Sequence, residues 1–224
     1  MQAIYPLAAV LAAYLLGSLA FAVIVSRVMG LSDPRTFGSK NPGATNVLRS
    51  GSKAAAVVTL LLDAIKGLLP VLLVKLFGKP YGLEEGTMAA VGLAAFVGHL
   101  WPVFFRFKGG KGVATFIGVV FGLNWLLGLA TAITWLVIAF FFRYSSLASL
   151  VSAVFALAYY LIGGGIAWYV DAGIAIALFV MAALLFYRHR ENIVRLLKGQ
   201  ESRLGAKKAE AAARPHAHSH HRHH

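Results

Sequence analysis

Residues 112–142 read GVATFIGVVFGLNWLLGLATAITWLVIAFFF and carry no acidic or basic side chain. A membrane-spanning helix needs about 20 mostly apolar residues, so the stretch can form one long helix or two short ones. Gly122, Asn124 and Gly128 lie in its middle and mark the place for a break. One helix gives the whole chain six spans, and two helices give it seven.

The composition of the whole chain indicates a membrane protein. Of its 224 residues, 59% are apolar and 13% are charged, whereas a soluble domain is about half apolar and a quarter charged. This composition also excludes intrinsic disorder over most of the chain. Because the chain contains no cysteine, a disulfide framework, a thiol nucleophile and a cysteine-bound metal are excluded.

Five further apolar stretches are long enough, or nearly so, to cross a bilayer. They cover residues 4–29, 54–77, 88–105, 146–162 and 168–187. Trp101, Trp125 and Tyr187 lie near the ends of apolar stretches, where aromatic rings favour the membrane interface. The sequence therefore predicts an all-α integral membrane protein.

The basic residues decide between six and seven spans. Lysine and arginine concentrate in segments 27–53, 106–111 and 188–208, and loops rich in these residues stay on the cytoplasmic side. Seven spans place all three segments on one side, whereas six place the last segment on the other. We therefore predict seven transmembrane helices, with the N-terminus outside and the C-terminus cytoplasmic. The spans on either side of Asn124 would be short and tilted, or would lie in a thinned bilayer.

The chain divides into a membrane domain and a tail. Residues 1–204 are predicted to form a single seven-helix domain, and residues 205–224 form a basic tail rich in alanine and histidine. The tail's composition predicts disorder, and its interrupted histidines are a weak indication of metal binding. The tail takes no part in the predicted site, and whether it is native or functional stays open.

The loop at residues 33–49 has the composition of a phosphate site. It reads DPRTFGSKNPGATNVLR and interleaves glycines, hydroxyls, amides and cations. Glycines let backbone N–H groups converge on an anion, and small donors and cations complete the shell. We predict Ser39 as a catalytic residue. The predicted substrate-binding residues are Gly38, Lys40, Asn41, Gly43, Thr45, Asn46 and Arg49. The alternative is an ordinary turn with positive charges on the cytoplasmic side.

A second glycine-rich loop, FKGGKGVAT at residues 107–115, leads into the long apolar stretch. Free N–H groups at the start of a helix attract anions, so we predict a second anion site with Lys111 as a catalytic residue. The predicted substrate-binding residues are Lys108, Gly109, Gly110 and Gly112. A nucleotide P-loop is excluded, since that motif needs Gly, four residues and then Gly-Lys-Ser/Thr. The alternative is a flexible linker between helices.

A third polar cluster, YRHREN at residues 187–192, lies where the last span leaves the membrane. His189 and Asn192 share one helical face by their three-residue spacing. Histidine titrates near neutral pH, so we predict His189 as a catalytic residue and Asn192 as a substrate ligand. Arg188 and Arg190 are interpreted as interface charges.

Three polar residues inside predicted spans stand out. Intramembrane charges are costly and usually pair or face a site. Asp63 and Lys66 are three residues apart, and a self-neutralising pair is as good an interpretation as a substrate contact. His99 is interpreted as a packing or hydrogen-bonding residue.

These segments together resemble the bacterial membrane glycerol-3-phosphate acyltransferase family that uses acyl-phosphate as donor. The resemblance extends over nearly the whole chain, to about Glu201. Its motifs are LGS at 16–18, GSKNPGATN at 38–46, DAIKG at 63–67, GHLWPVF at 98–104, FKGGKGVAT at 107–115 and RHRENI at 188–193. The histidine-rich tail is not part of the family pattern.

The resemblance implies a seven-helix enzyme of the bacterial cytoplasmic (inner) membrane whose site faces the cytoplasm. It implies transfer of a fatty acyl group from acyl-phosphate to the 1-hydroxyl of sn-glycerol 3-phosphate, the first step of phospholipid synthesis. The products are lysophosphatidic acid and phosphate. We expect no metal, no other cofactor and no nucleic acid. The expected partners are both substrates and the lipid bilayer, with the soluble enzyme that makes acyl-phosphate as a further candidate.

The residues fit this chemistry. Acyl-phosphate carries a good leaving group, so a hydroxyl can attack it directly, and catalysis rests on positioning and on stabilising negative charge. Position 104 is Phe, so His99 lacks the aspartate that follows the histidine of acyl-CoA-type glycerolipid acyltransferases. The proton acceptor is left open between His189 and a substrate phosphate. A transporter of phosphorylated metabolites is the competing class, but its polar groups would lie at mid-membrane.

Overall fold

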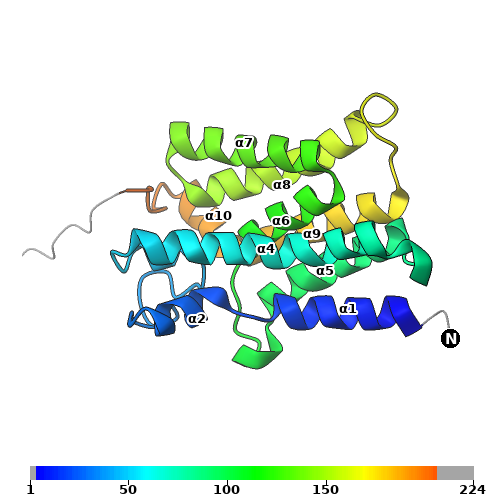
Figure 1. Cartoon of the computed structure of the whole chain (residues 1–224). Helices are drawn as coiled ribbons and strands as arrows, with labels where there is room; N and C mark the ends of the chain where they lie inside the picture. Colours follow the sequence, from blue (N-terminus) through cyan, green and yellow to red (C-terminus); the bar gives the residue numbers. More distant parts are fainter. Residues whose placement is uncertain (1–3, 206–224) are drawn as a thin grey trace, which may run out of the picture.

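The computed structural model describes residues 4–205, and every regular element in that range is helical (Figure 1). The predicted tail at 205–224 therefore lies, except for Gly205, outside the described residues. The α-helices are α1 (Ile4–Gly17), α2 (Phe21–Val28), α3 (Ala44–Leu48), α4 (Lys53–Phe77), α5 (Glu85–Leu100), α6 (Val113–Leu123), α7 (Trp125–Phe142), α8 (Ser145–Ile162), α9 (Ala172–Arg188) and α10 (Arg190–Leu197). The short 3₁₀ helices η1 (Lys79–Tyr81) and η2 (Val103–Phe105) precede and follow α5.

Several of these helices are long and apolar enough to cross a bilayer. α4, α7, α8 and the segment Glu85–Phe105 meet this criterion alone, and the bent pairs α1–α2 and α9–α10 meet it when each pair counts as one span. Four to six segments of the described chain therefore qualify, as in a multi-pass membrane protein. α6 has 11 residues and is too short to qualify by length.

The apolar stretch at 112–142 is broken at Asn124, as predicted. The Asn124 side chain accepts hydrogen bonds from two backbone N–H groups in the first turn of α7 and so caps this helix. On the other side of the break, Lys75 Nζ of α4 donates to the Leu123 carbonyl oxygen at 3.0 Å. Both helix ends at the break thus have side-chain hydrogen-bond partners.

The first predicted span, residues 4–29, is not one helix. α1 and α2 meet at an angle of 45° across the non-helical residues 18–20. Lys66 Nζ of α4 donates a hydrogen bond of 2.7 Å to the Leu19 carbonyl oxygen in this break. A side chain from another helix therefore satisfies a carbonyl group that the break leaves without its intrahelical partner.

Two other predicted spans have different ends. The helix expected over 88–105 starts at Glu85 and ends at Leu100, because the residue before Pro102 is disfavoured in helical conformation. The helix expected over 168–187 starts only at Ala172, where the side chain of the preceding residue, Asp171, accepts a hydrogen bond from the first turn.

Glycines bring the helices around the site close together. A Cβ on Gly118 of α6 would overlap the carbonyl oxygen of Ala64 in α4, and a Cβ on Gly67 would overlap that of Thr115. Gly17 of α1 approaches the backbone of α5 in the same way. Small residues at such contacts are typical of helix packing in membranes.

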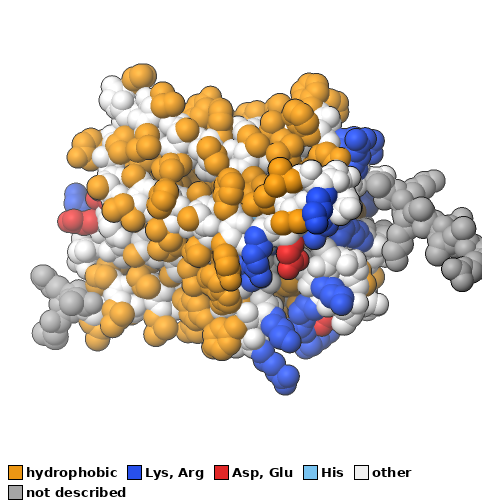
Figure 2. Space-filling view, turned by 180° about the vertical axis from the view of Figure 1, so that it is seen from behind, with side chains coloured by type: hydrophobic (Ala, Val, Ile, Leu, Met, Phe, Trp, Pro, Cys, Tyr) orange, Lys and Arg blue, Asp and Glu red, His pale blue; other side chains and the backbone are white. Residues whose placement is uncertain are grey.

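The face of the molecule seen in Figure 2 is apolar in its middle and basic at one end. Apolar side chains cover the middle of the face seen in Figure 2, whereas lysine and arginine gather at one end of it. The described chain begins at one end of the helix bundle, and α2, α10 and the loop between α2 and α3 lie at the opposite end (Figure 1). An apolar face of this kind suits contact with the hydrocarbon layer of a bilayer.

Candidate active site

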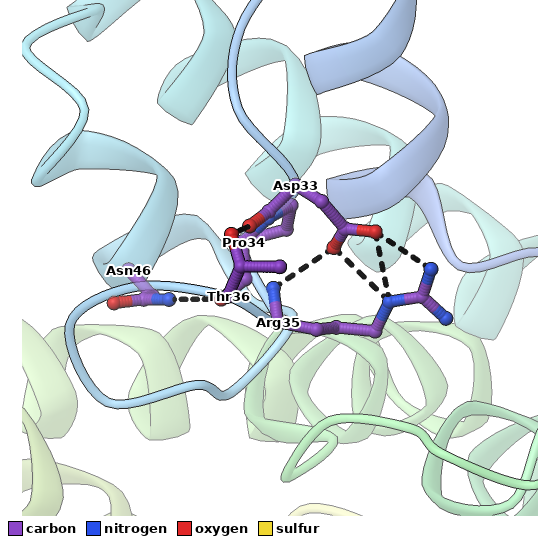
Figure 3. Close-up of polar contacts among 5 residues, drawn as sticks. All are labelled: Asp33, Pro34, Arg35, Thr36 and Asn46. Atoms are coloured by element: carbon purple, nitrogen blue, oxygen red, sulfur yellow. Dashed lines mark hydrogen bonds and ion pairs between the residues drawn. The ribbon is translucent and has the colours of Figure 1, made fainter.

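The loop between α2 and α3 is held in shape by its own polar groups (Figure 3). Arg35 donates to the Asp33 carboxylate through Nη2 at 2.7 Å and through Nε at 3.0 Å. These side-chain hydrogen bonds lower the pKa of Asp33, which therefore stays ionised at neutral pH. Thr36 Oγ1 donates to the Asp33 carbonyl oxygen at 2.7 Å, and Asn46 Nδ2 donates to the Pro34 carbonyl oxygen at 2.7 Å. These four hydrogen bonds hold the loop in its conformation.

Asn46 also fixes the position of Ser39. Its Oδ1 accepts a hydrogen bond of 3.1 Å from the Ser39 backbone N–H, and the residue is only 1% exposed. The backbone turns through left-handed conformations at Gly38 (φ +58°) and Lys40 (φ +54°). A Cβ on Gly38 would overlap Asn46 Oδ1, so both conformation and space favour glycine here. Asn46 therefore holds the loop, while the Ser39 and Lys40 side chains are exposed.

The remaining predicted ligands of this loop lie on or beside α3. Gly43 immediately precedes α3, and Asn41 is half-buried. The half-buried Thr45 has its hydroxyl oxygen 3.4 Å from that of Ser145, at the start of α8. Arg49 is exposed and donates to Ser202 Oγ at 2.8 Å. The loop is thereby tied to α8 and to the C-terminal segment that follows α10.

The loop between η2 and α6 packs its glycines between α5 and α9. The Gly110 N–H donates to the His99 carbonyl oxygen at 3.2 Å. Arg188 donates to the carbonyl oxygens of Gly109 at 2.8 Å and of Gly110 at 3.1 Å. Arg188 thus binds two oxygens whose partial negative charge would oppose an anion. Gly112 takes φ +82° just before α6 begins.

Lys111 and Lys108 lie in different surroundings. Lys111 is half-buried, and its Nζ donates to Asn192 Oδ1. Burial lowers the pKa of Lys111 to about 8, although the carboxylate of Glu201 acts in the opposite direction. Lys108 is exposed. Of these two lysines, Lys111 is therefore the one linked to another motif.

His189 is buried at the junction of α9 and α10, with 2% of the residue exposed. Its Nδ1 lies 2.8 Å from the Leu185 carbonyl oxygen, and since a carbonyl only accepts, Nδ1 carries the proton. Burial, followed by the positive charge of Lys111, lowers the pKa of His189 to about 4. The imidazole is therefore neutral at physiological pH, and its Nε2 keeps a lone pair.

Asn192 belongs to a hydrogen-bonded cluster around Glu201. Asn192 Nδ2 donates to Glu201 Oε1 at 2.6 Å, Ser146 Oγ donates to the same oxygen at 2.7 Å, and Arg195 Nε donates to Oε2 at 2.7 Å. Burial alone would raise the pKa of Glu201, but these hydrogen bonds outweigh it and the pKa is lowered. The Asn192 amide is thus oriented with its oxygen toward Lys111.

The three predicted motifs therefore come together at one end of the bundle. A Cβ on Gly110 would come within 2.9 Å of the Pro42 carbonyl oxygen, so the two glycine loops touch. The second loop is joined to α9 and α10 through Arg188 and through the contact between Lys111 and Asn192. Cations, hydroxyls and backbone N–H groups gathered in this way can bind phosphate groups and stabilise negative charge.

Two residues have roles that the sequence interpretation missed. Arg188 was interpreted as an interface charge, yet it holds the second glycine loop. Glu201 orients Asn192 from the segment after α10. In the sequence, the position of Arg188 directly before His189 could have indicated that it belongs to the site. Among residues 4–205, no three histidine, aspartate or glutamate side chains are arranged to hold a metal ion.

Comparison with known proteins identifies the family. The family model described as "Glycerol-3-phosphate acyltransferase" matches residues 7–199. A glycerol-3-phosphate acyltransferase of Albidiferax ferrireducens is 70% identical over 207 residues, which cover 92% of either chain. One of Bordetella petrii is 60% identical over 196 residues, which cover 88% of this chain and 92% of the relative.

Solved structures agree with this match. The chain is similar to PlsY (YgiH), described as an integral membrane glycerol 3-phosphate acyltransferase, in its glycerol 3-phosphate form, with a TM-score of 0.82 and 41% identity over 90% of this chain and 96% of the other. The lysophosphatidic acid form of PlsY gives a TM-score of 0.80 and 40% identity over the same shares. Because the family model matches most of this chain, the protein belongs to the membrane-integral glycerol-3-phosphate acyltransferase family.

Proposed function

We propose that the protein transfers a fatty acyl group from acyl-phosphate to the 1-hydroxyl of sn-glycerol 3-phosphate. The observation that carries this proposal is the meeting of three motifs, which bring Ser39 and Arg49, Lys111, and His189 and Asn192 to one end of the bundle. The solved PlsY forms with glycerol 3-phosphate and lysophosphatidic acid support this acceptor and product. Two phosphate-bearing substrates account for two glycine-and-cation loops.

In the proposed site, some residues supply positive charge and others supply hydrogen bonds. Lys111 and Arg49 supply positive charge to the phosphate groups, and Ser39 donates a hydrogen bond to negative charge that develops during acyl transfer. Asn192 orients the substrate, and Asn46 shapes the loop from within. The further substrate-binding residues in this proposal are Gly38, Lys40, Asn41, Gly43, Thr45, Lys108, Gly109, Gly110 and Gly112.

The proposed reaction needs no covalent enzyme intermediate. The 1-hydroxyl oxygen attacks the acyl carbon, the bond from that carbon to the phosphate oxygen breaks, and the hydroxyl proton passes to the departing phosphate. The lone pair on His189 Nε2 accepts a hydrogen bond from the 1-hydroxyl and orients it. The low pKa of His189 makes its imidazole a weak base, which favours phosphate as the proton acceptor.

We further propose seven spans, with the N-terminus outside and the site facing the cytoplasm of a bacterial inner membrane. The described chain starts and finishes at opposite ends of the bundle (Figure 1), which supports an odd number of crossings. The basic end in Figure 2 supports this orientation, because loops rich in lysine and arginine stay on the cytoplasmic side. A soluble enzyme that makes acyl-phosphate would then reach the site from the same side.

The donor is tested with purified protein in lipid, supplied with either an acyl-phosphate or the corresponding acyl-CoA. The proposal predicts phosphate release from acyl-phosphate only when glycerol 3-phosphate is present, and little turnover with acyl-CoA. Preferred use of acyl-CoA would show that the donor is wrong while leaving the family assignment intact.

A further inference from the structure

Four polar side chains with no part in the proposed reaction are buried together: Asp63 and Lys66 of α4, His99 of α5 and Thr115 of α6. Each residue is at most 7% exposed. Lys66 Nζ lies 2.8 Å from Asp63 Oδ1. His99 Nδ1 lies 3.5 Å from the same carboxylate oxygen and 3.2 Å from Thr115 Oγ1. We refer to these four residues as the buried cluster.

The hydrogen bonds of the buried cluster fix the direction of the His99 ring. Thr115 Oγ1 donates to the Asp63 backbone carbonyl oxygen at 2.9 Å, so the hydroxyl oxygen is left to accept from an N–H at His99 Nδ1. The carboxylate of Asp63, beside the same ring nitrogen, favours the proton there as well. Nδ1 therefore faces the cluster, and Nε2 lies on the opposite side of the ring.

Stability alone explains the buried cluster poorly. Moving an ion pair into a membrane span costs free energy, and well-packed apolar side chains of similar volume often stabilise a protein as well or better. The pair of Asp63 and Lys66 does join α4 to the α1–α2 break, through the bond from Lys66 to the Leu19 carbonyl oxygen. That bond does not account for His99, whose Nε2 lies next to Gly110 rather than next to the α1–α2 break.

His99 contacts the second glycine loop in two ways. Its carbonyl oxygen accepts the Gly110 N–H at 3.2 Å. Its ring is so close to Gly110 that a Cβ on this glycine would overlap Nε2. The same Cβ would come within 2.9 Å of the Pro42 carbonyl oxygen, so the ring and both loops meet at Gly110. Lys111 is the next residue along the chain.

We infer that His99 is a positioning residue that sets the place of the loop Gly109–Lys111, and that Asp63, Lys66 and Thr115 hold its ring. The inference rests on the proposed function for the role of Lys111. A misplacement of about 1 Å in groups that orient substrate can cost about a hundredfold in rate. A small shift of the loop after loss of the His99 ring should therefore have a large effect on activity.

A double-mutant cycle of His99→Phe with Lys111→Ala tests this inference in the full chain in lipid. Phenylalanine keeps a ring of similar size but offers no nitrogen to Thr115. His99→Phe alone should raise KM by about tenfold, for the same substrate whose KM is raised by Lys111→Ala. In the Lys111→Ala background, His99→Phe should raise this KM by less than about a further twofold. Fully multiplicative effects would overturn the inference, because residues that act independently add in free energy.

Two variants serve as controls for the cycle. His99→Asn places an amide N–H near the position of Nδ1 and should recover part of the KM that His99→Phe loses. Thr131→Val removes a comparably buried hydroxyl that donates to the Leu127 carbonyl oxygen at 2.7 Å in α7. Because Thr131 has no link to the loop, its effect should be multiplicative with that of Lys111→Ala.

Hydrogen exchange without substrate separates this inference from the proposed function. Peptides over residues 108–112 should exchange about tenfold faster in His99→Phe than in the parent protein, while peptides over α8 stay unchanged. Unchanged exchange at 108–112 would overturn the positioning role. A parent protein that does not turn over acyl-phosphate and glycerol 3-phosphate would instead reject the proposed function, and the exchange result would still stand.

Discussion

Lys111 and Lys108 are three residues apart but differ in their surroundings. Lys111 is half-buried against Asn192, whereas Lys108 is exposed. Lys111→Ala should lower kcat/KM by about tenfold to more than a hundredfold, the usual range for losing a hydrogen bond to a charged group. Lys108→Ala should lower it by less than about threefold. Steady-state kinetics of both variants check this, and equal small effects would remove the case for an anion site at Lys111.

The lowered pKa of Lys111 predicts a pH dependence. Its folded pKa is about 8, so the free enzyme loses this positive charge as the pH rises through 8. The value of kcat/KM reports the free enzyme and should decline above about pH 8. Lys111→Arg keeps its charge at such pH values, because arginine titrates above about 12, and should move or abolish the decline. The same decline in the arginine variant would contradict the assignment.

His189 orients the acceptor hydroxyl in the proposed reaction. His189→Asn should therefore act mainly on KM, with a loss smaller than the 10²–10⁴-fold that is usual for removing a general base. The acidic limb of the pH profile should persist near pH 6 in the variant, where a substrate phosphate still titrates. Disappearance of that limb, together with more than about a hundredfold loss in kcat, would show that His189 is the base.

The residue types at the site could be predicted from the sequence, but the role of each residue could not. Glycines, hydroxyls and cations near one another indicate a phosphate site whatever the fold. Asn46 and Arg188 show where this reasoning ends, since one holds its own loop and the other holds a loop about 80 residues away. Both roles depend on tertiary contacts, which the local sequence does not encode.

At the scale of helices, the break at Asn124 could be predicted and the break at residues 18–20 could not. Asn124 is a polar residue inside an apolar stretch, and its side chain caps the helix that follows. At the α1–α2 break, Lys66 of another helix donates a hydrogen bond to the Leu19 carbonyl oxygen. A prediction from local pattern alone reads residues 4–29 as one helix for this reason.

The short α6 depends on its cap from α4. Lys75 Nζ donates to the carbonyl oxygens of Gly122 and Leu123, at 3.4 and 3.0 Å. Lys75→Met should destabilise the protein by about 1–3 kcal/mol, since these carbonyl groups would lose a charged donor. Lys75 and Lys79 are both exposed, so Lys79→Met in η1 is the matched control for losing an exposed lysine and should have little effect. Thermal unfolding in detergent checks the pair, and equal melting temperatures would contradict the capping role.

At the scale of the whole molecule, composition predicts a membrane protein and the basic segments predict which end faces the cytoplasm. The described helices meet the first expectation, and the second stays a prediction. The number of crossings is harder to predict, because α6 is too short to be recognised by length and is supported by neighbouring helices instead.

The proposed activity is acyl transfer from acyl-phosphate to glycerol 3-phosphate at the site where the three motifs meet. The most direct measurement follows phosphate and lysophosphatidic acid together in one reaction with purified protein in lipid vesicles. Acyl transfer should give one lysophosphatidic acid for each phosphate released, and neither product when glycerol 3-phosphate is left out. Phosphate release without lysophosphatidic acid, or passage of unchanged glycerol 3-phosphate across the vesicle membrane, would contradict it.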